Sequence, residues 1–324
     1  ELKEQVDLRP IQKLSNQNDA YASYLLAQYY SNTEQYIPLL EKAGQQGSAA
    51  AQMALADEYG FRLPVEQQDA KKAELGLEAV FAVAGKETWV TGLHFTNAAL
   101  SPEFENVFNA FNAKKIDFKY SEGMKKLFDL QINYAKKPVN SVDYSTQVEK
   151  LFSLGKVAFM QQGNWTLGAI KGIDEELAAN IGFLPMPIVG AKEDSIPVGI
   201  PMYWTVNSTK DEKTQAAAKA FLNWMYTSEK GKDAIINKFG FIPPFKGFDS
   251  PDLQPKDALA KDIMKYASAG KTIQWVFMGY PSGWGMEKIG VDLQKYVDGK
   301  LTWDQLIENG KKSWEEVHLL VRIQ

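Results

Sequence analysis

The stretch LFSLGKVAFMQQGNWTLGAI, residues 151–170, holds a helix end, a short strand and a loop in close succession. Leu151–Leu154 closes a helical pattern, and Gly155 then supplies the left-handed backbone conformation that commonly ends a helix. The apolar run Val157–Met160 is typical of a buried strand, and it stops at Gly163-Asn164-Trp165. Because ligands of open α/β sheets bind at the carboxyl ends of strands, we expect Trp165 at a ligand site. A large indole held there suits the apolar face of a sugar ring.

Other segments extend this pattern over most of the chain. They are Gly85-Lys86-Glu87-Thr88-Trp89, Ala217–Asp233 (AAKAFLNWMYTSEKGKD), Gly240-Phe241-Ile242-Pro243 and Gly299-Lys300-Leu301-Thr302-Trp303. In their order and spacing, these segments and the stretch 151–170 together resemble the extracellular solute-binding proteins of ABC transporters. The resemblance is to the sugar-binding, maltose-binding-protein-like family 1, and it covers about residues 77–318.

The resemblance implies an α/β fold, with a periplasmic-binding-protein-like body of type II. Residues 77–195 and 250–318 would build the second lobe of that body, and residues 198–245 would be a remnant of the first lobe. The family normally begins with about a hundred residues of first lobe, which are missing here, so the first lobe is expected to be incomplete. The chain would then be a fusion, a chimera or a natural truncation. The tail 319–324 extends past the family pattern.

An all-α segment, residues 1–76, is expected to precede the body. Ala22–Tyr30 (ASYLLAQYY) aligns with Ala51–Tyr59 (AQMALADEY), and Gly44 and Gly47 mark a turn between them. Residues 18–75 therefore resemble tetratricopeptide-like helical repeats, with an ordinary Ala-rich α-hairpin as the alternative. Two repeats are fewer than the three or so that a solenoid needs, so the segment would have to dock on something else.

Apolar periodicity and turn residues predict the remaining elements of the body. The strands are expected at Leu77–Ala84, Ile181–Leu184 and within Val198–Val206. The helices are expected at Thr88–Ala99, Ser121–Lys136, Ser145–Leu154, Lys213–Tyr226, Asp257–Ala269, Met286–Val297 and Thr302–Val317.

Composition narrows the class of protein. The net charge of −4 provides no basic patch, so a nucleic-acid partner is not expected. No apolar run approaches the roughly 18 residues of a membrane span. Cysteine is absent, which excludes disulfides and thiolate metal sites and suits an extracytoplasmic protein. The chain opens on Glu1-Leu2-Lys3-Glu4 without a signal peptide, as either a cytoplasmic protein or a mature form would.

Aromatic residues in loops are the first candidates for a sugar site. Trp165 is the strongest, and Trp284 lies in a second loop rich in Gly and Pro, GYPSGWG, whose counterpart in the family brings an aromatic residue to the ligand. Tyr203 and Trp204 lie at the expected crossover between the lobes, and one of the two should face the core because side chains alternate along a strand. The other tryptophans of helical patterns, Trp224, Trp303 and Trp314, are expected to be core residues, and Trp275 stays ambiguous.

Three further candidates adjoin these loops. Glu87 and Trp89 open a helix directly after a strand, so Glu87 is either a hydroxyl acceptor or a first-turn carboxylate favoured by the helix dipole. Asn164 either bonds a hydroxyl or caps the turn that follows it.

Catalysis is not expected, and neither a cofactor nor a metal ion is. The chain has only two histidines, no Gly-x-Ser-x-Gly elbow, no phosphate-binding loop and no cluster with metal-ligand spacing. We therefore expect a carbohydrate-binding receptor that works with an ABC-transporter permease outside the cytoplasmic membrane. The alternative is a helical-repeat module that binds a protein partner, with the body as its scaffold; a glycoside hydrolase is a distant third.

Overall fold

The computed structural model describes residues 7–31, 33–48, 51, 54–55, 75–200, 203–243, 245–248 and 250–321. The α-helices are α1 (Arg9–Asn16), α2 (Ala20–Tyr29), α3 (Tyr36–Gln45), α6 (Thr96–Phe104), α7 (Val107–Asn112), α8 (Ser121–Asn133), α9 (Leu167–Ile173), α10 (Glu175–Asn180), α11 (Glu212–Thr227), α12 (Glu229–Asp233), α13 (Ala258–Ser268), α14 (Gly290–Val297) and α15 (Trp303–Val321). The strands are β1 (Ala79–Ala82), β2 (Val157–Met160), β3 (Ile196–Val198) and β4 (Thr272–Gln274). Turns of π-helix are η2 (Val90–Phe95), η4 (Thr146–Phe152), η6 (Ala234–Lys238) and η9 (Trp284–Ile289), and turns of 3-10 helix are η3 (Val139–Ser141), η5 (Asn164–Thr166), η7 (Pro251–Leu253) and η8 (Val276–Gly279).

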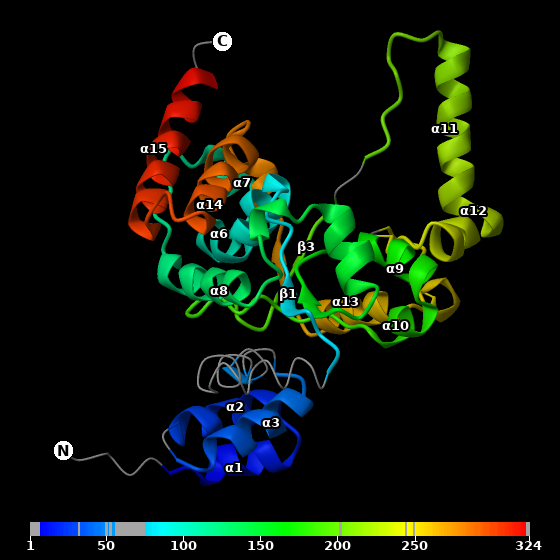
Figure 1. Ribbon diagram of the computed structural model, residues 1–324. Helices are drawn as coiled ribbons and strands as arrows, with labels where there is room; N and C mark the ends of the chain where they lie inside the picture. Colours follow the sequence, from blue (N-terminus) through cyan, green and yellow to red (C-terminus); the bar gives the residue numbers. More distant parts are fainter. Residues whose placement is uncertain are drawn as a thin grey trace.

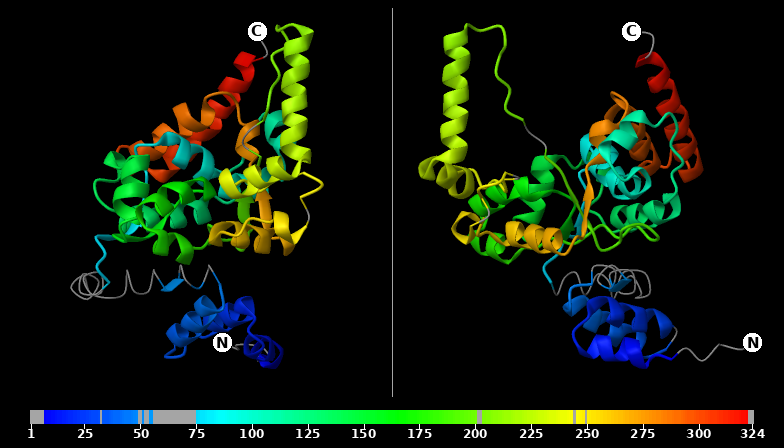
Figure 2. Two further views of the ribbon diagram at one scale, coloured as in Figure 1. Left: turned by 90° about the vertical axis from the view of Figure 1, so that its right-hand side faces the viewer. Right: turned by 180° about the vertical axis from the view of Figure 1, so that it is seen from behind.

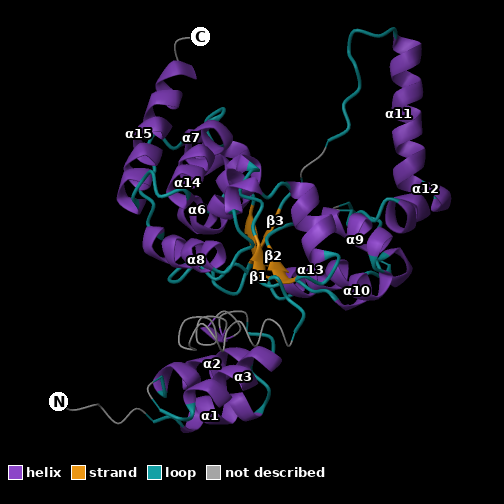
Figure 3. Ribbon diagram, viewed as in Figure 1, coloured by secondary structure: helices purple, strands orange, loops and turns teal. Residues whose placement is uncertain are grey.

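The strands lie in the middle of the body, between two groups of helices (Figure 3). One group contains α6, α7, α8, α14 and α15, and the other contains α9, α10 and α13 (Figure 1). The helices predicted from the sequence all form, with ends displaced by a few residues. This arrangement brings the loops after the strands to the junction between the two groups.

Two parallel pairs of strands make up the sheets of the described residues. β1 pairs with β2, with Phe81 opposite Phe159, and β3 pairs with β4. The carboxylate of Glu78, just before β1, lies 2.7 Å from the Lys136 ammonium and 2.8 Å from that of Lys156, which fastens the start of this pair. The strand predicted at Val157–Met160 is therefore confirmed as β2. The strand predicted at Leu77–Ala84 also forms, but as the shorter β1.

Two strand predictions were wrong. Ile181–Leu184 forms no strand, because the Phe183 N–H donates to the carboxylate of Asp262 at 2.9 Å and not to a neighbouring strand. Of the described residues within Val198–Val206, only Val198 belongs to β3. Residues 203–206 are irregular, and none of their backbone groups bonds to another described residue.

The largest apolar core lies among the helices of the first group and β1. Phe95, Phe128, Trp284 and Trp314 are fully buried in it, and Trp303 is nearly so. The expectation that Trp303 and Trp314 are packing residues is thus confirmed. The turns η2 and η9 approach each other closely at Gly92 and Gly285. Any larger residue at position 92 would clash, because a Cβ there would overlap the carbonyl oxygen of Gly285. This close approach fixes η2 against the core.

Helices α2 and α3 pack around a small core of their own, which contains Ala27, Leu40 and Ala43, and α1 packs against α2. Asp19 caps α2 by accepting the N–H of Ala22 at 2.8 Å. In all the views these helices form a compact unit beside the body (Figures 1 and 2). Most of the second predicted repeat, Ala51–Tyr59, lies outside the described residues, so the repeat-like character of the segment stays a prediction.

Helix α11 projects away from the body (Figure 2). It forms where an amphipathic helix was predicted, with Asp211 as its cap. Its apolar stripe is uncovered, however: Phe221 and Trp224 stack on each other, with 56% and 46% of their surfaces exposed. The expectation that Trp224 is a core residue is therefore wrong, because no described element packs on that stripe.

Candidate functional site

Three tryptophans follow the carboxyl ends of parallel strands at the centre of the body. Trp165 lies five residues after β2, Trp275 comes directly after β4, and Trp89 follows β1 at the start of the next helix. Gly155 and Gly270 precede β2 and β4 with φ of +66° and +68°, a conformation that glycine adopts without steric cost. The order of a helix, a glycine, a strand and a tryptophan thus occurs twice, once before Trp165 and once before Trp275. This repeated order is a sequence signal that could have identified Trp275, whose role the sequence analysis left ambiguous.

The three indoles border an open hollow of about 310 Å³, which is close to the smallest size of small-molecule sites. Its lining consists of Trp89, His94, Trp165, Trp275, Phe277 and Met278. The ring centroids of Trp89 and Trp165 are 6.3 Å apart, and those of Trp165 and Trp275 are also 6.3 Å apart. These rings are therefore in mutual contact, and a ligand has to lie on their outer faces, where 41% of the Trp165 surface is exposed.

A chain of amide side chains holds Trp165 in place. The indole N–H of Trp165 donates to Gln162 at 3.2 Å, and the Gln162 amide donates to Gln147 at 2.7 Å. Gln147 is fully buried, and its amide donates to the carbonyl of Ala82 at the end of β1 at 2.7 Å. Gly163 makes room for this arrangement, because an added Cβ would overlap the indole of Trp165. The orientation of Trp165 is thus tied to the neighbouring strand.

A buried asparagine holds the loop after β4. The side-chain amide of Asn97, on α6, donates to the carbonyl of Gln274 at 3.1 Å, and its oxygen accepts the N–H of Phe277 at 3.4 Å. Gly199, just after β3, lies against the indole of Trp275, which an added Cβ would touch at 2.5 Å. Sequence reasoning did not single out Asn97, since an asparagine inside a helix carries no local signal of such a contact.

His94 lies at the centre of the aromatic lining. Its imidazole centroid is 4.7 Å from that of Phe277, 5.2 Å from Trp275 and 5.3 Å from Trp165. Burial lowers the pKa of His94 to about 4, so the imidazole is neutral near pH 7. It sits on η2, and single π-turns are frequent at functional sites. Sequence reasoning had set this histidine aside.

Two of the sequence candidates are close to lining residues in the sequence but do not line the hollow themselves. The carboxylate of Glu87 accepts the indole N–H of Trp89 at 3.2 Å and the backbone N–H of Tyr144 at 3.5 Å. Glu87 therefore orients Trp89. Asn164 begins η5, where its backbone carbonyl accepts the N–H of Leu167, so the turn is closed by the main chain and not by the Asn164 side chain.

The other candidates lie elsewhere. Trp284 was wrongly predicted to line the cleft: its indole is fully buried and donates to the carbonyl of Gly310 at 3.0 Å, because its loop folds back onto α15. Tyr203 and Trp204 are exposed and do not line the hollow. The Trp204 indole instead donates to the hydroxyl of Tyr226 on α11 at 2.7 Å.

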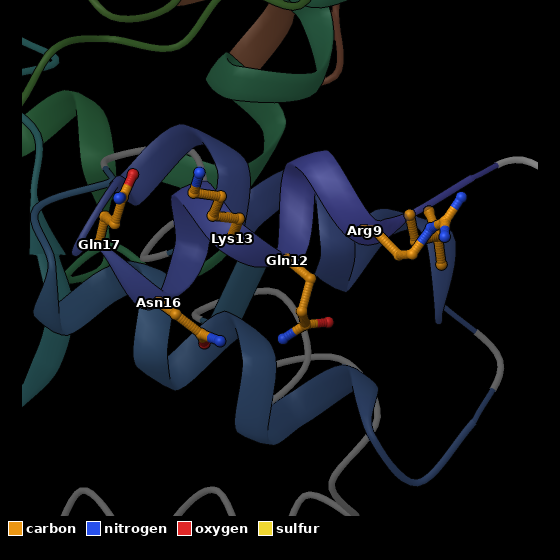
Figure 4. Close-up of a pocket in the computed structure, with 6 residues that line it drawn as sticks. Arg9, Gln12, Lys13, Asn16 and Gln17 are labelled. Carbon is orange, nitrogen blue, oxygen red and sulfur yellow. The ribbon is translucent and has the colours of Figure 1, made fainter.

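A second hollow, of about 530 Å³, lies along α1 (Figure 4). All of its lining residues belong to that helix or flank it: Leu8, Arg9, Gln12, Lys13, Asn16 and Gln17. Because a single helix forms it, no groups converge on it from different elements, as they do in binding sites. In the part of the chain that the structure describes, no cluster of acidic side chains and histidines has the arrangement of a metal site. None of the described helices combines the length and apolar character needed to cross a membrane.

Residues 69–262 match the family of bacterial extracellular solute-binding proteins. The chain belongs to this family. As a solute-binding protein it has a binding function and not a catalytic one, and its fold is that of periplasmic binding proteins. A comparison with curated proteins finds no match.

Solved structures of other solute-binding proteins show the same fold. A chitin oligosaccharide binding protein is 19% identical with a TM-score of 0.56, and the match covers 82% of this chain and 67% of that one. The putative binding protein MsmE from Bacillus subtilis, in an open conformation, is 15% identical with a TM-score of 0.55, covering 83% and 69%. The apo form of RafE from Streptococcus pneumoniae is 16% identical with a TM-score of 0.55, covering 81% and 67%.

Proposed function

We propose that this solute-binding protein captures a mono- or oligosaccharide on the outer faces of the aromatic hollow. The observation that carries the proposal is the position of Trp89, Trp165 and Trp275 at the carboxyl ends of parallel strands, next to a hollow with one exposed indole. The C–H faces of pyranose rings pack well on such rigid, flat apolar surfaces. The names of the neighbours, which include a chitin oligosaccharide binding protein, support a sugar over an amino acid or an ion.

In this proposal the protein is the receptor component of an ABC transporter. It works outside the cytoplasmic membrane, in the periplasm or on the outer face, as the description of its family suggests. A hinge motion brings a second wall over the sugar, and the permease recognises the closed form. No cofactor takes part in this mechanism.

We further propose that residues 77–195 and 250–318 form the second lobe and that residues 198–245 are the remnant of an incomplete first lobe. About a third of each solved neighbour has no counterpart in this chain. A lobe that lacks its sheet would leave its helices uncovered and its strands without neighbours. The exposed apolar stripe of α11 and the irregular residues 203–206 agree with this expectation. In that case Tyr203 and Trp204 face the sugar only when the lobe is complete.

The test is isothermal titration calorimetry with a panel of oligosaccharides. Trp165→Ala should lower the affinity for the sugar that binds by about two- to tenfold, because a stacking contact worth about 0.5–1.5 kcal/mol is lost. Trp224→Ala is the matched control, since this indole is exposed to a similar degree but lies on α11. Absence of heat with every sugar, or equal affinities for the two variants, would refute the proposal.

A second candidate function rests on α2. Tyr21, Leu25 and Tyr29 are exposed and spaced by four residues, so they form one apolar face of the helix. This face favours a protein partner for the N-terminal segment. If it binds one, replacing Tyr21 and Leu25 by serine in the full chain should abolish co-purification of that partner and leave sugar binding unchanged.

A further inference from the structure

His94 contributes to the lining of the hollow a polar side chain that has no hydrogen bond to another described residue. The indole N–H groups of Trp89 and Trp165 already donate to Glu87 and Gln162. By contrast, neither imidazole nitrogen of His94 bonds to another residue in the described part of the chain, where its contacts are with aromatic rings. A half-buried polar group without a protein partner gains a hydrogen bond when a ligand supplies one.

The chemistry of the imidazole matches that of a sugar hydroxyl. A neutral imidazole has one N–H donor and one acceptor nitrogen, and a hydroxyl both donates and accepts. Carbon atoms dominate the rest of the lining, with Phe277 and Met278 beside the indoles. A sugar that stacks on these rings therefore meets in His94 the side chain of this lining that both donates and accepts a hydrogen bond, whereas an indole N–H only donates.

Stacking responds to a hydroxyl only where its axial position interrupts the stacked C–H face, and it does not recognise a hydroxyl that points away from that face. A fixed hydrogen-bonding group does, because it is left unpaired by the wrong epimer. His94 is fixed by its position on η2, which the glycine contact between Gly92 and Gly285 holds against the core.

We propose that the imidazole of His94 determines the stereochemical specificity of the hollow by hydrogen-bonding one hydroxyl of the sugar stacked on Trp165. This inference rests on the proposed sugar-binding function. The ligand class it names is a saccharide that presents a hydroxyl of defined configuration next to its apolar face.

The experiment measures affinities for pairs of sugars that differ in one configuration. Cellobiose and lactose, and isomaltose and melibiose, differ only at C4 of the non-reducing ring, and N,N′-diacetylchitobiose tests a change at C2. The wild type should prefer one member of a pair by about tenfold. His94→Phe keeps a ring of similar shape, and it should bring that ratio close to one while it lowers affinity for the preferred sugar.

Two controls separate this role from a structural one. His318→Phe replaces the other histidine, whose ring packs against Trp314, and should leave the ratio unchanged. In protein labelled with ¹³C-histidine, the ring resonance of His94 should shift on addition of the preferred sugar and that of His318 should not.

The possible outcomes distinguish a failure of the role proposed for His94 from a failure of the proposed function. Sugar binding with the same epimer ratio in wild type and His94→Phe overturns the role of His94 and leaves the proposed function standing. If the wild type binds sugars without preferring one epimer, the role of His94 is likewise overturned and the proposed function still stands. If no sugar binds the wild type, the proposed function falls and this inference falls with it.

Discussion

Replacing Trp284 by alanine should destabilise the body strongly. The indole is fully buried among Phe118, Tyr280 and Trp314, and a buried tryptophan removes about 150–250 Å² from water. At about 25 cal/mol per Å² this is worth roughly 4–6 kcal/mol, and measured Trp→Ala changes in cores are about 3–5 kcal/mol. The lost hydrogen bond to Gly310 adds about 1 kcal/mol.

We therefore expect the free energy of unfolding to fall by about 4 kcal/mol, which lowers Tm by roughly 10 °C. Urea and thermal unfolding followed by far-ultraviolet circular dichroism measure this without depending on tryptophan emission. Trp224→Ala is the matched control and should cost less than about 1 kcal/mol, because its indole is already half exposed. If Trp284→Ala does not fold, Trp284→Phe should fold with a smaller loss. A loss for Trp284→Ala as small as that of the control would refute the assignment of this loop to the core.

Two other predictions concern the frame of the site. Asn97→Ala removes two hydrogen bonds to partly buried backbone groups of the loop around Trp275, so it should cost about 1–3 kcal/mol in urea unfolding. It should also weaken sugar binding in calorimetry severalfold, and an unchanged affinity would show that this loop needs no such support. The ion pairs with Lys136 and Lys156 lower the pKa of Glu78 from 4.5 to about 2, so the stability they contribute is present above about pH 4.5 and is lost as the pH falls towards 2. The difference in Tm between wild type and Glu78→Gln should therefore shrink over that interval, and a constant difference would contradict it.

Sequence reasoning succeeded where the determinants were local. Before Trp165, the helix end, the glycine and the apolar run lie within a few residues of one another. The strand predicted there forms, and Trp165 is partly exposed after it. The same local pattern precedes Trp275, which shows that the signal was repeated in the chain.

It failed where the outcome depended on distant partners. A strand needs a neighbour, so the apolar runs Ile181–Leu184 and 203–206 stayed unpaired. Trp284 looks like a loop residue until its loop packs on α15, about thirty residues further along. Trp224 lies on an apolar helix stripe of the kind that usually faces a core, but no described element covers that stripe.

The central claim is that Trp89, Trp165 and Trp275 form the sugar-binding wall. The most direct measurement is ¹⁹F NMR of protein labelled with 5-fluorotryptophan, with each of the eight resonances assigned by single Trp→Phe replacements. Adding the oligosaccharide that binds should shift the resonances of these three residues, whereas those of the buried Trp284 and Trp314 stay in place. Shifts confined to Trp204 and Trp224, or no shift in any of the three, would contradict the account.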